Sequence, residues 1–147
     1  EWELAKRNCS AVSMIMLDID FFKKYIDSYG HHARDVALQV IANTLKSWVR
    51  DTDLVARIGG EEFVIIILGS TERKTFEVAE RIRIQIENTP IIQNGGKSFV
   101  TASFGMGVIF PYISEDSVEV FHQKVDRLLY CAKLDGRNQV KMSMLTM

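Results

Sequence analysis

The sequence has little of several residue types that mark particular classes of protein. It contains two prolines and nine glycines in 147 residues, which argues against a long disordered linker. Cys9 and Cys131 are its only cysteines. They lack metal-ligand spacing, so we expect two free thiols in a reducing cytoplasm. The net charge of −1 gives no general attraction to nucleic acid or to an anionic membrane.

Long apolar runs are also missing. The longest, such as residues 63–68, have the length of a strand, so neither a membrane span nor a signal peptide is predicted. The composition is 47% hydrophobic and 25% charged, which is ordinary for a soluble globular domain with its own core. Because the chain starts at Glu1 without methionine, we interpret residues 1–147 as a single domain, trimmed at its N-terminus and belonging to a larger protein.

Hydrophobic periodicity predicts the order of elements as β-α-α-β-β-α-β-α-β. Strand-like runs cover residues 11–18, 53–58, 62–68, 98–110 and 139–142. Helical runs cover residues 20–29, 32–49 and 71–86, and a last helix stops near Gly136. The Gly59-Gly60 pair predicts a tight hairpin, and Gly105 and Gly107 indicate a bulge or a close backbone approach. This order favours an α+β sandwich with helices over a largely antiparallel sheet of about five strands.

Acidic residues stand at two points that this fold can bring together. Asp18 closes the first strand, and Glu61 lies at the hairpin tip. If the strand and hairpin are neighbours, the two carboxylates meet at one rim of the sheet. Such a pair is unfavourable without a cation, and oxygen ligands favour Mg²⁺ or Mn²⁺, completed by water and phosphate. A solvated helix cap and a charged turn explain the same residues without a metal.

Groups that can bind phosphate lie close by in the predicted fold. A helix begins just after Asp18, and its free backbone N–H groups favour an anion. Lys133 and Arg137, near the end of the last helix, add positive charge. An acidic metal site beside a helix N-terminus is typical of phosphoryl transfer.

Three segments resemble one known family. Residues 59–63 read GGEEF, residues 18–35 read DIDFFKKYIDSYGHHARD, and residues 132–138 read AKLDGRN. They resemble the GGDEF motif, the D-x-D-x-F-K-x-x-N-D-x-x-G-H-x-x-G-D stretch and the A-K-x-x-G-R-N motif of GGDEF domains, the catalytic modules of bacterial diguanylate cyclases. The match covers nearly the whole chain in the right order. It implies a fold like that of adenylyl cyclase catalytic domains, a ferredoxin-like sandwich.

The resemblance also implies a role for each matching residue. Asp18, Glu61 and the backbone carbonyl of Ile19 would bind Mg²⁺ or Mn²⁺, two ions per active site, and Glu61 would also assist deprotonation of the attacking hydroxyl. The remaining substrate contacts would come from the amides around Phe21, Phe22 and Lys23, from Lys133 and Arg137 on the β- and γ-phosphates, and from Asp35 on guanine.

The family's reaction joins two GTP molecules into cyclic di-GMP. Each domain holds one GTP, so the resemblance implies a homodimer in which the two reactants meet. The R-x-x-D of Arg50 and Asp53, together with Arg81, resembles the family's inhibitory product site. Because GTP is cytoplasmic, we expect a cytoplasmic domain without membrane contact, which is compatible with a membrane-anchored parent protein.

Two positions depart from the family pattern. Ile26 stands where the family has an asparagine that bonds guanine, and Arg34 stands where a glycine precedes Asp35. Arg34 would either crowd the base or stack on it. Alternatives to the active cyclase are therefore a degenerate module that binds GTP or cyclic di-GMP and regulates a neighbouring domain, and a related cyclase with an adenine-containing product. Asp35 argues against the adenine product, because a carboxylate matches guanine donors.

Overall fold

The computed structural model describes residues 2–93 and 95–142. Twelve elements follow one another, and their bounds are α1 (Trp2–Arg7), β1 (Val12–Ile19), α2 (Phe22–Tyr29), α3 (His31–Ser47), β2 (Leu54–Ile58), β3 (Glu62–Leu68), α4 (Glu72–Asn88), β4 (Ile91–Gln93), β5 (Gly96–Ser98), β6 (Ala102–Ile109), α5 (Val118–Leu134) and β7 (Val140–Met142).

A five-stranded sheet in the order β2-β3-β1-β6-β7 forms the centre of the molecule. β1 runs antiparallel to both β3 and β6, β2 runs antiparallel to β3, and β7 alone joins the sheet in parallel, beside β6. The parallel pair arises because α5 carries the chain back along the sheet between β6 and β7. The predicted α+β class and mostly antiparallel sheet are confirmed.

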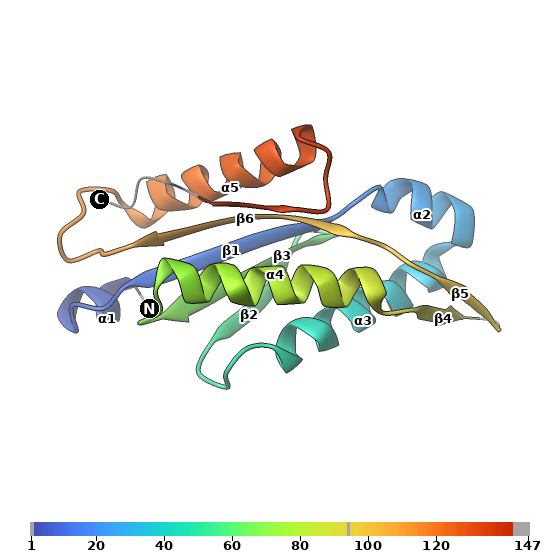
Figure 1. The fold of residues 1–147 in the computed structure, drawn as a ribbon, viewed down its shortest axis with the longest axis horizontal. Coiled ribbons are helices and arrows are strands. Elements are labelled where there is room, and N and C mark those ends of the chain that lie inside the picture. The colour runs from blue at the N-terminus through green and yellow to red at the C-terminus, as the bar shows by residue number, and fades with distance from the viewer. Residues whose placement is uncertain (1, 94, 143–147) are drawn as a thin grey trace.

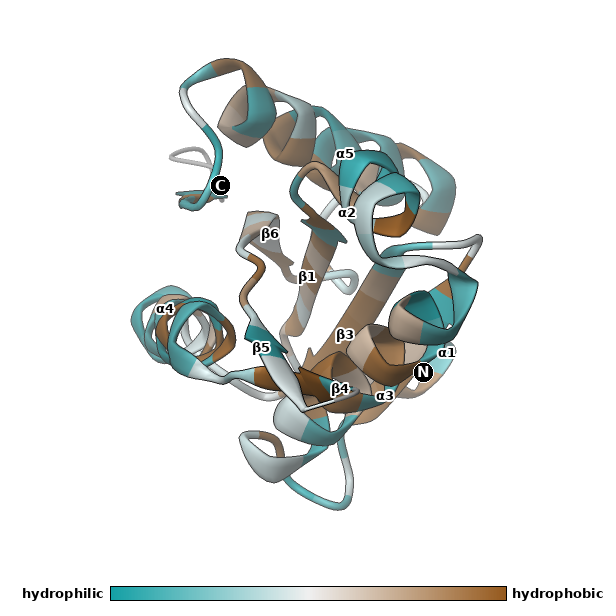
Figure 2. Cartoon of the chain, turned by 90° about the vertical axis from the view of Figure 1, so that its right-hand side faces the viewer, coloured by the Kyte–Doolittle hydropathy of each residue, from teal (hydrophilic) through white to brown (hydrophobic). Residues whose placement is uncertain are grey.

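Helices cover both faces of the sheet, as Figure 1 shows: α5 lies over one face, and α3 and α4 lie over the other. β1 is buried on both faces, and its residues alternate between two apolar clusters. Ile15 and Leu17 face the larger cluster with α3 and α4, whereas Met14 and Met16 face α5. Figure 2 looks along the sheet and shows the apolar colouring turned inward on these helices.

One end of the sheet gathers the segments that the motifs occupy. In the strand register, Asp18 at the end of β1 lies between Glu62 on β3 and Ser103 on β6. The Gly59-Gly60 turn before β3 and the start of α2 are at this same end, and Gly59 adopts a positive φ of 71°, which glycine tolerates at little cost. The topology therefore brings the acidic strand end and the GGEEF hairpin together.

Three details differ from the prediction. Helix α2 begins at Phe22 and not at Asp20, because the Asp20 backbone N–H bonds the carbonyl of Thr101 at 2.8 Å. The predicted long strand over residues 98–110 is two elements, since Gly96–Ser98 pairs with Ile91–Gln93 in a small separate hairpin. No bulge interrupts β6 in its register with β1 from Ala102 to Ile109.

No helix in the described part of the chain combines the length and the apolar character needed to cross a bilayer. Cys9 and Cys131 are both free thiols, as predicted.

Gly105 in β6 is at a close backbone approach, which is one of the two features that the glycines of this strand predicted. A Cβ at this position would lie 2.3 Å from the backbone nitrogen of Leu129 and 2.6 Å from the carbonyl oxygen of Val125. Helix α5 therefore packs directly on the strand backbone, which fixes its height above β1. At Gly107 an added Cβ would meet the Phe121 ring at 3.2 Å, and that side chain can shift.

We predict that Gly105→Ala lowers the free energy of unfolding by about 3 kcal/mol, because the helix backbone itself must move to accommodate the new carbon. Gly107→Ala, the matched control on the same strand, should cost about 1 kcal/mol or less. Urea unfolding of both variants measures the difference. Equal losses in the two variants would contradict the close approach of α5.

Candidate active site

The carboxylate of Asp18 is the centre of the predicted metal site. Its Oδ2 accepts a hydrogen bond from the Lys133 ammonium at the end of α5. Its Oδ1 is buried and has no hydrogen-bond partner among the described residues. Asp18 is only 7% exposed, so this unpaired oxygen is costly in the free protein. A bound cation would satisfy it.

Glu61 lies beside Asp18, because the hairpin backbone is joined to the end of β1: the Ile19 N–H donates to the Glu61 carbonyl at 3.4 Å. Burial, together with the nearby Asp18 carboxylate, raises the pKa of Glu61 to about 7, although Lys133 acts to lower it. Burial also raises the pKa of Glu62, helped by Asp126 and Asp18. This rim therefore accumulates more carboxylates than its one lysine balances.

The donor set fits a hard divalent cation of the Mg²⁺ class. Within the described residues, no group of three or more His, Cys, Asp and Glu side chains is arranged to hold a metal on its own. Mg²⁺ does not need such a group, because it commonly binds through one or two carboxylates plus water and phosphate. Asp18 and Glu61, with the Ile19 carbonyl next to them, match that pattern.

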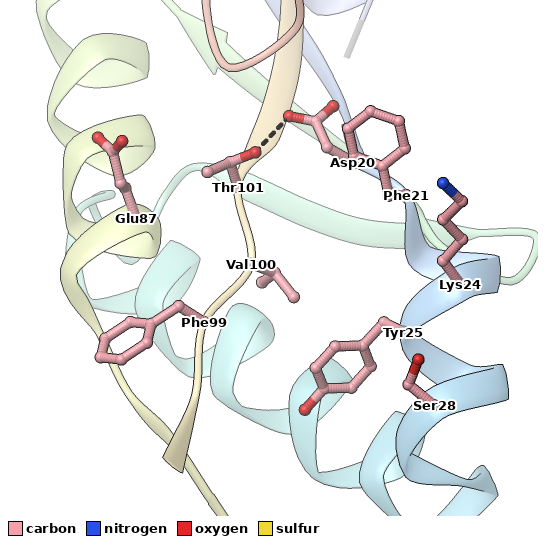
Figure 3. Close-up of a pocket in the computed structure, with 9 residues that line it drawn as sticks. All are labelled: Asp20, Phe21, Lys24, Tyr25, Ser28, Glu87, Phe99, Val100 and Thr101. Atoms are coloured by element: carbon pink, nitrogen blue, oxygen red, sulfur yellow. Dashed lines mark hydrogen bonds between the residues drawn. The ribbon is translucent and has the colours of Figure 1, made fainter.

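Asp20 is fully engaged in holding the neighbouring loops. Its side chain is 1% exposed and accepts hydrogen bonds from the Ser103 hydroxyl at 2.6 Å, the Thr101 hydroxyl at 2.6 Å and the Asn138 backbone N–H at 3.0 Å. Figure 3 shows the carboxylate turned toward Thr101. Asp20 thus joins the end of β1 to β6 and to the turn after α5, and the prediction did not include this role.

The same network continues into α4. Arg83 donates to both carboxylate oxygens of Glu80, at 2.7 and 3.0 Å, and to the Asn138 side-chain oxygen at 3.1 Å. The Asn138 side-chain amide in turn donates to Glu87 at 2.9 Å. Asn138 has a positive φ of 47°, so these bonds hold a backbone conformation that is uncommon outside glycine.

The start of α2 provides the predicted phosphate-binding amides. Phe21 precedes the helix with φ 54° and ψ 33°, and no side chain caps the helix start. The first N–H groups of a helix have no intrahelical acceptor, so those around Phe21, Phe22 and Lys23 can donate to an anion. The Arg137 guanidinium lies 4.5 Å from the centre of the Phe21 ring, which keeps this cation near the helix start.

Two pockets flank this region. One, of about 370 Å³, lies between α2 and the segment before β6; Figure 3 shows its lining, which includes Phe21, Lys24 and Phe99. The other, of about 300 Å³, lies between α3 and the β2–β3 hairpin, and its lining residues are Arg34, Asp35, Leu38, Gln39, Ala42, Arg57 and Phe63. The predicted guanine ligand Asp35 thus lies in the second pocket, paired with its neighbour Arg34 at 3.1 Å.

The predicted product site lies away from the other site residues, before β2. Arg50 and Asp53 bond each other: the Asp53 carboxylate accepts from the Arg50 backbone N–H at 2.8 Å and from its guanidinium at 3.2 Å. Arg50 also donates to the Leu68 carbonyl at 3.2 Å. Arg81 on α4 lies over the Trp48 ring, with 5.9 Å to its centre.

Comparisons with known proteins agree with this geometry. The family model described as "Diguanylate cyclase, GGDEF domain" matches residues 1–139. The chain belongs to the GGDEF family. It is similar to Diguanylate cyclase A of Treponema denticola, with 39% identity over 90% of this chain and 35% of that protein.

Solved structures of GGDEF domains show the same fold. The active GGEEF domain of a diguanylate cyclase from Vibrio cholerae has a TM-score of 0.87 and 28% identity, covering 99% of this chain and 90% of that one. The GGDEF domain of DgcB from Caulobacter crescentus, solved with c-di-GMP, has a TM-score of 0.88 and 25% identity, covering 95% of this chain and 82% of that one. The chain spans 28–42% of the length of several curated relatives.

The Asp20 network leads to a prediction about stability. Asp20→Asn should lower the free energy of unfolding by about 2–3 kcal/mol, because an amide cannot accept from all three donors and leaves buried hydrogen-bonding groups unpaired. The exposed Asp27→Asn on α2 serves as the control and should be neutral within about 0.5 kcal/mol. Denaturant unfolding measures both. A neutral Asp20→Asn would show that the network contributes nothing to stability.

The raised pKa of Glu61 leads to a prediction about pH. Without metal, folded Glu61 keeps its proton up to about pH 7, whereas an unperturbed glutamate loses it near 4.5. This contribution to stability is therefore full below about pH 4.5 and is lost as the pH rises through about 7. In metal-free buffer, Glu61→Gln should reduce the fall in melting temperature between pH 5 and 8, and the exposed Glu77→Gln should not. Identical pH profiles for Glu61→Gln and the wild type would contradict the shift.

Proposed function

We propose that this chain is the catalytic domain of a diguanylate cyclase, which condenses two GTP molecules into cyclic di-GMP and pyrophosphate. The observation that carries the proposal is the buried, unpartnered Oδ1 of Asp18 beside a Glu61 whose pKa is about 7. These two carboxylates can hold a cation, and they lie next to the amides at the start of α2, where a triphosphate can bind.

The residues around the triphosphate have distinct tasks in this proposal. The amides of Phe21, Phe22 and Lys23 donate to the β- and γ-phosphates. Lys133, which neutralises Asp18 in the free protein, would bind the phosphates once Asp18 holds a cation. Arg137 is already near, because Phe21 and the turn after α5 restrain it.

The chemical step joins the two substrates. The 3′-oxygen of one GTP forms a bond to the α-phosphorus of the other, the bond from that phosphorus to the bridging oxygen of pyrophosphate breaks, and Glu61 accepts the hydroxyl proton. In the metal-free protein the pKa of this carboxyl is about 7, and a bound cation would lower that pKa, so that Glu61 is ionised and able to accept the proton. The 3′-oxygen of the second nucleotide then forms a bond to the α-phosphorus of the first in the same way, which closes the ring and releases the second pyrophosphate.

Mg²⁺ or Mn²⁺, two ions per site, would be held by Asp18, Glu61 and the Ile19 carbonyl, and would supply charge neutralisation at the α-phosphate and the leaving pyrophosphate. Since each domain binds one GTP, two copies must face each other as a homodimer. GTP is a cytoplasmic nucleotide, so the proposal places the domain in the cytoplasm, with no nucleic-acid partner and no membrane contact of its own.

Product inhibition is part of the proposal. Arg50 keeps a side chain that is 62% exposed while it bonds Asp53, so its guanidinium is accessible to a guanine or a phosphate. Arg81 would add a second cation from α4. The Caulobacter DgcB domain was solved with c-di-GMP, and we extend that ligand to this chain.

A regulatory module with little turnover is the second candidate. Two observations favour it: Ile26 packs against the core, where it offers no hydrogen-bonding group, and Arg34 is bonded to the carboxylate proposed to bind guanine. This candidate predicts binding of GTP or cyclic di-GMP without product formation. A cyclase with an adenine-containing product would instead reveal itself when ATP and GTP are supplied together.

The deciding prediction concerns Glu61. At high protein concentration with GTP and Mg²⁺, the wild type should form cyclic di-GMP, and Glu61→Ala should reduce the rate by about a hundredfold or more, because it removes both a metal ligand and the base. Chromatography of the products measures the rate. Glu77→Ala, an exposed glutamate on α4, is the matched control and should leave the rate unchanged.

Failure to form product has two readings that a further measurement separates. If GTP binds but no product appears, an artificially dimerised chain carrying Ile26→Asn tests whether dimerisation or the altered base site is responsible. If that chain is also inactive while it binds GTP, the regulatory module replaces the cyclase. If GTP does not bind at all, the cyclase fails for this chain, and the regulatory module, as a binder of cyclic di-GMP, replaces it.

A further inference from the structure

The pocket between α3 and the β2–β3 hairpin has an apolar floor and a polar rim. Leu38 and Phe63, both buried, contribute to the floor, and a flat base can pack against them. The rim residues Arg34, Asp35 and Gln39 come from α3, and Arg57 comes from β2. Arg57 already donates to the Gly60 carbonyl at 3.2 Å, so it supports the hairpin turn.

The Arg34–Asp35 pair leaves part of each group unused. The Nε and Nη2 of Arg34 both donate to the same oxygen, Oδ1 of Asp35, at 3.3 and 3.1 Å. Among the described residues, nothing donates to Oδ2 of Asp35, and Nη1 of Arg34 has no acceptor. The rim therefore presents an unpaired acceptor oxygen and an unpaired N–H group side by side.

This pairing of groups is complementary to guanine. Guanine carries N–H donors at N1 and N2 and acceptors at O6 and N7, and arginine commonly bonds the O6 and N7 pair in two parallel hydrogen bonds. Adenine presents an amino donor at the position of O6 and lacks the N1 proton. A carboxylate beside a guanidinium therefore favours guanine on two edges at once.

The residue at position 26 also bears on how the base would be bound. Ile26 stands where the resembled family has an asparagine. Its aliphatic side chain has no hydrogen-bond donor or acceptor, and it is partly buried against the core. A pocket that lacks the amide has to obtain a donor for the base elsewhere. Among the rim residues, Arg34 is the one whose cation is next to the guanine-accepting carboxylate.

We infer that Arg34 is a specificity-determining residue of this chain, which turns from Asp35 to donate to O6 and N7 of the bound guanine. The inference rests on the proposed function, since it concerns the base of the same substrate. The turn is inexpensive, because the pair is exposed, with 42% and 64% of the two side chains accessible, and exposed ion pairs contribute little to stability.

The test compares two nucleotides that differ only at N7. Dideoxy-GTP and 7-deaza-dideoxy-GTP both lack the 3′-hydroxyl, so neither is turned over while its affinity is measured by calorimetry with Mg²⁺. The wild type should bind dideoxy-GTP about tenfold more tightly, because the deaza base leaves one guanidinium N–H without an acceptor. In Arg34→Met the two affinities should become equal within about twofold, through a loss of dideoxy-GTP affinity.

Arg73→Met is the matched control, since Arg73 is 90% exposed on α4 and does not line the pocket; it should keep the tenfold difference. Equal affinities in the wild type, or the same difference in Arg34→Met, would overturn the inference, and cyclic di-GMP formation from GTP by the same preparation would show that the proposed function stands. If the wild type binds neither nucleotide and forms no product, the proposed function fails and the inference fails with it.

Discussion

The buried carboxylate of Asp20 is the constraint on which the arrangement of the site depends. It takes hydrogen bonds from β6 and from the turn after α5 at once, and that turn is tied through Asn138 to Arg83 on α4. Asp18 and Ile19 immediately precede Asp20, Phe21 immediately follows it, and Arg137 adjoins Asn138. One carboxylate with all its hydrogen bonds made therefore positions the proposed metal ligands, the amides proposed to bind phosphate and a cation, which belong to different elements.

The charges around Asp18 in the free protein, like the geometry of the site, are compatible with the proposed binding of a cation. Lys133 neutralises Asp18, and burial, together with the nearby Asp18 carboxylate, raises the pKa of Glu61. The ion pair with Lys133 does not satisfy the whole carboxylate, because Oδ1 of Asp18 stays buried without a hydrogen-bond partner among the described residues. The site holds an energetic cost in the free state that ligand binding can relieve, which is common where a structure is shaped for function.

Sequence reasoning predicted the parts of this structure that depend on local pattern. The apolar run ending at Asp18, the glycine hairpin and the helical periodicities each determined an element, and short connections brought Asp18 to Glu61. The small β4–β5 hairpin escaped prediction because three-residue strands are too short to show a period. The role of Asn138 also escaped, although it was visible as the last letter of a motif, because its partners Asp20 and Arg83 are distant in sequence.

The position of β2 has a consequence for motion. This strand is at the edge of the sheet, with β3 as its one neighbour, and four of its five residues are exposed. It connects Asp53 at one end to the Gly59-Gly60 turn at the other. Glu61 therefore lies next to an edge strand, and local opening of such a strand costs less free energy than unfolding of the whole domain. Movement of this edge strand would displace Glu61, the carboxylate proposed to act in catalysis, and would link the Asp53 end of β2 to the hairpin while the core between α3, α4 and α5 stays closed.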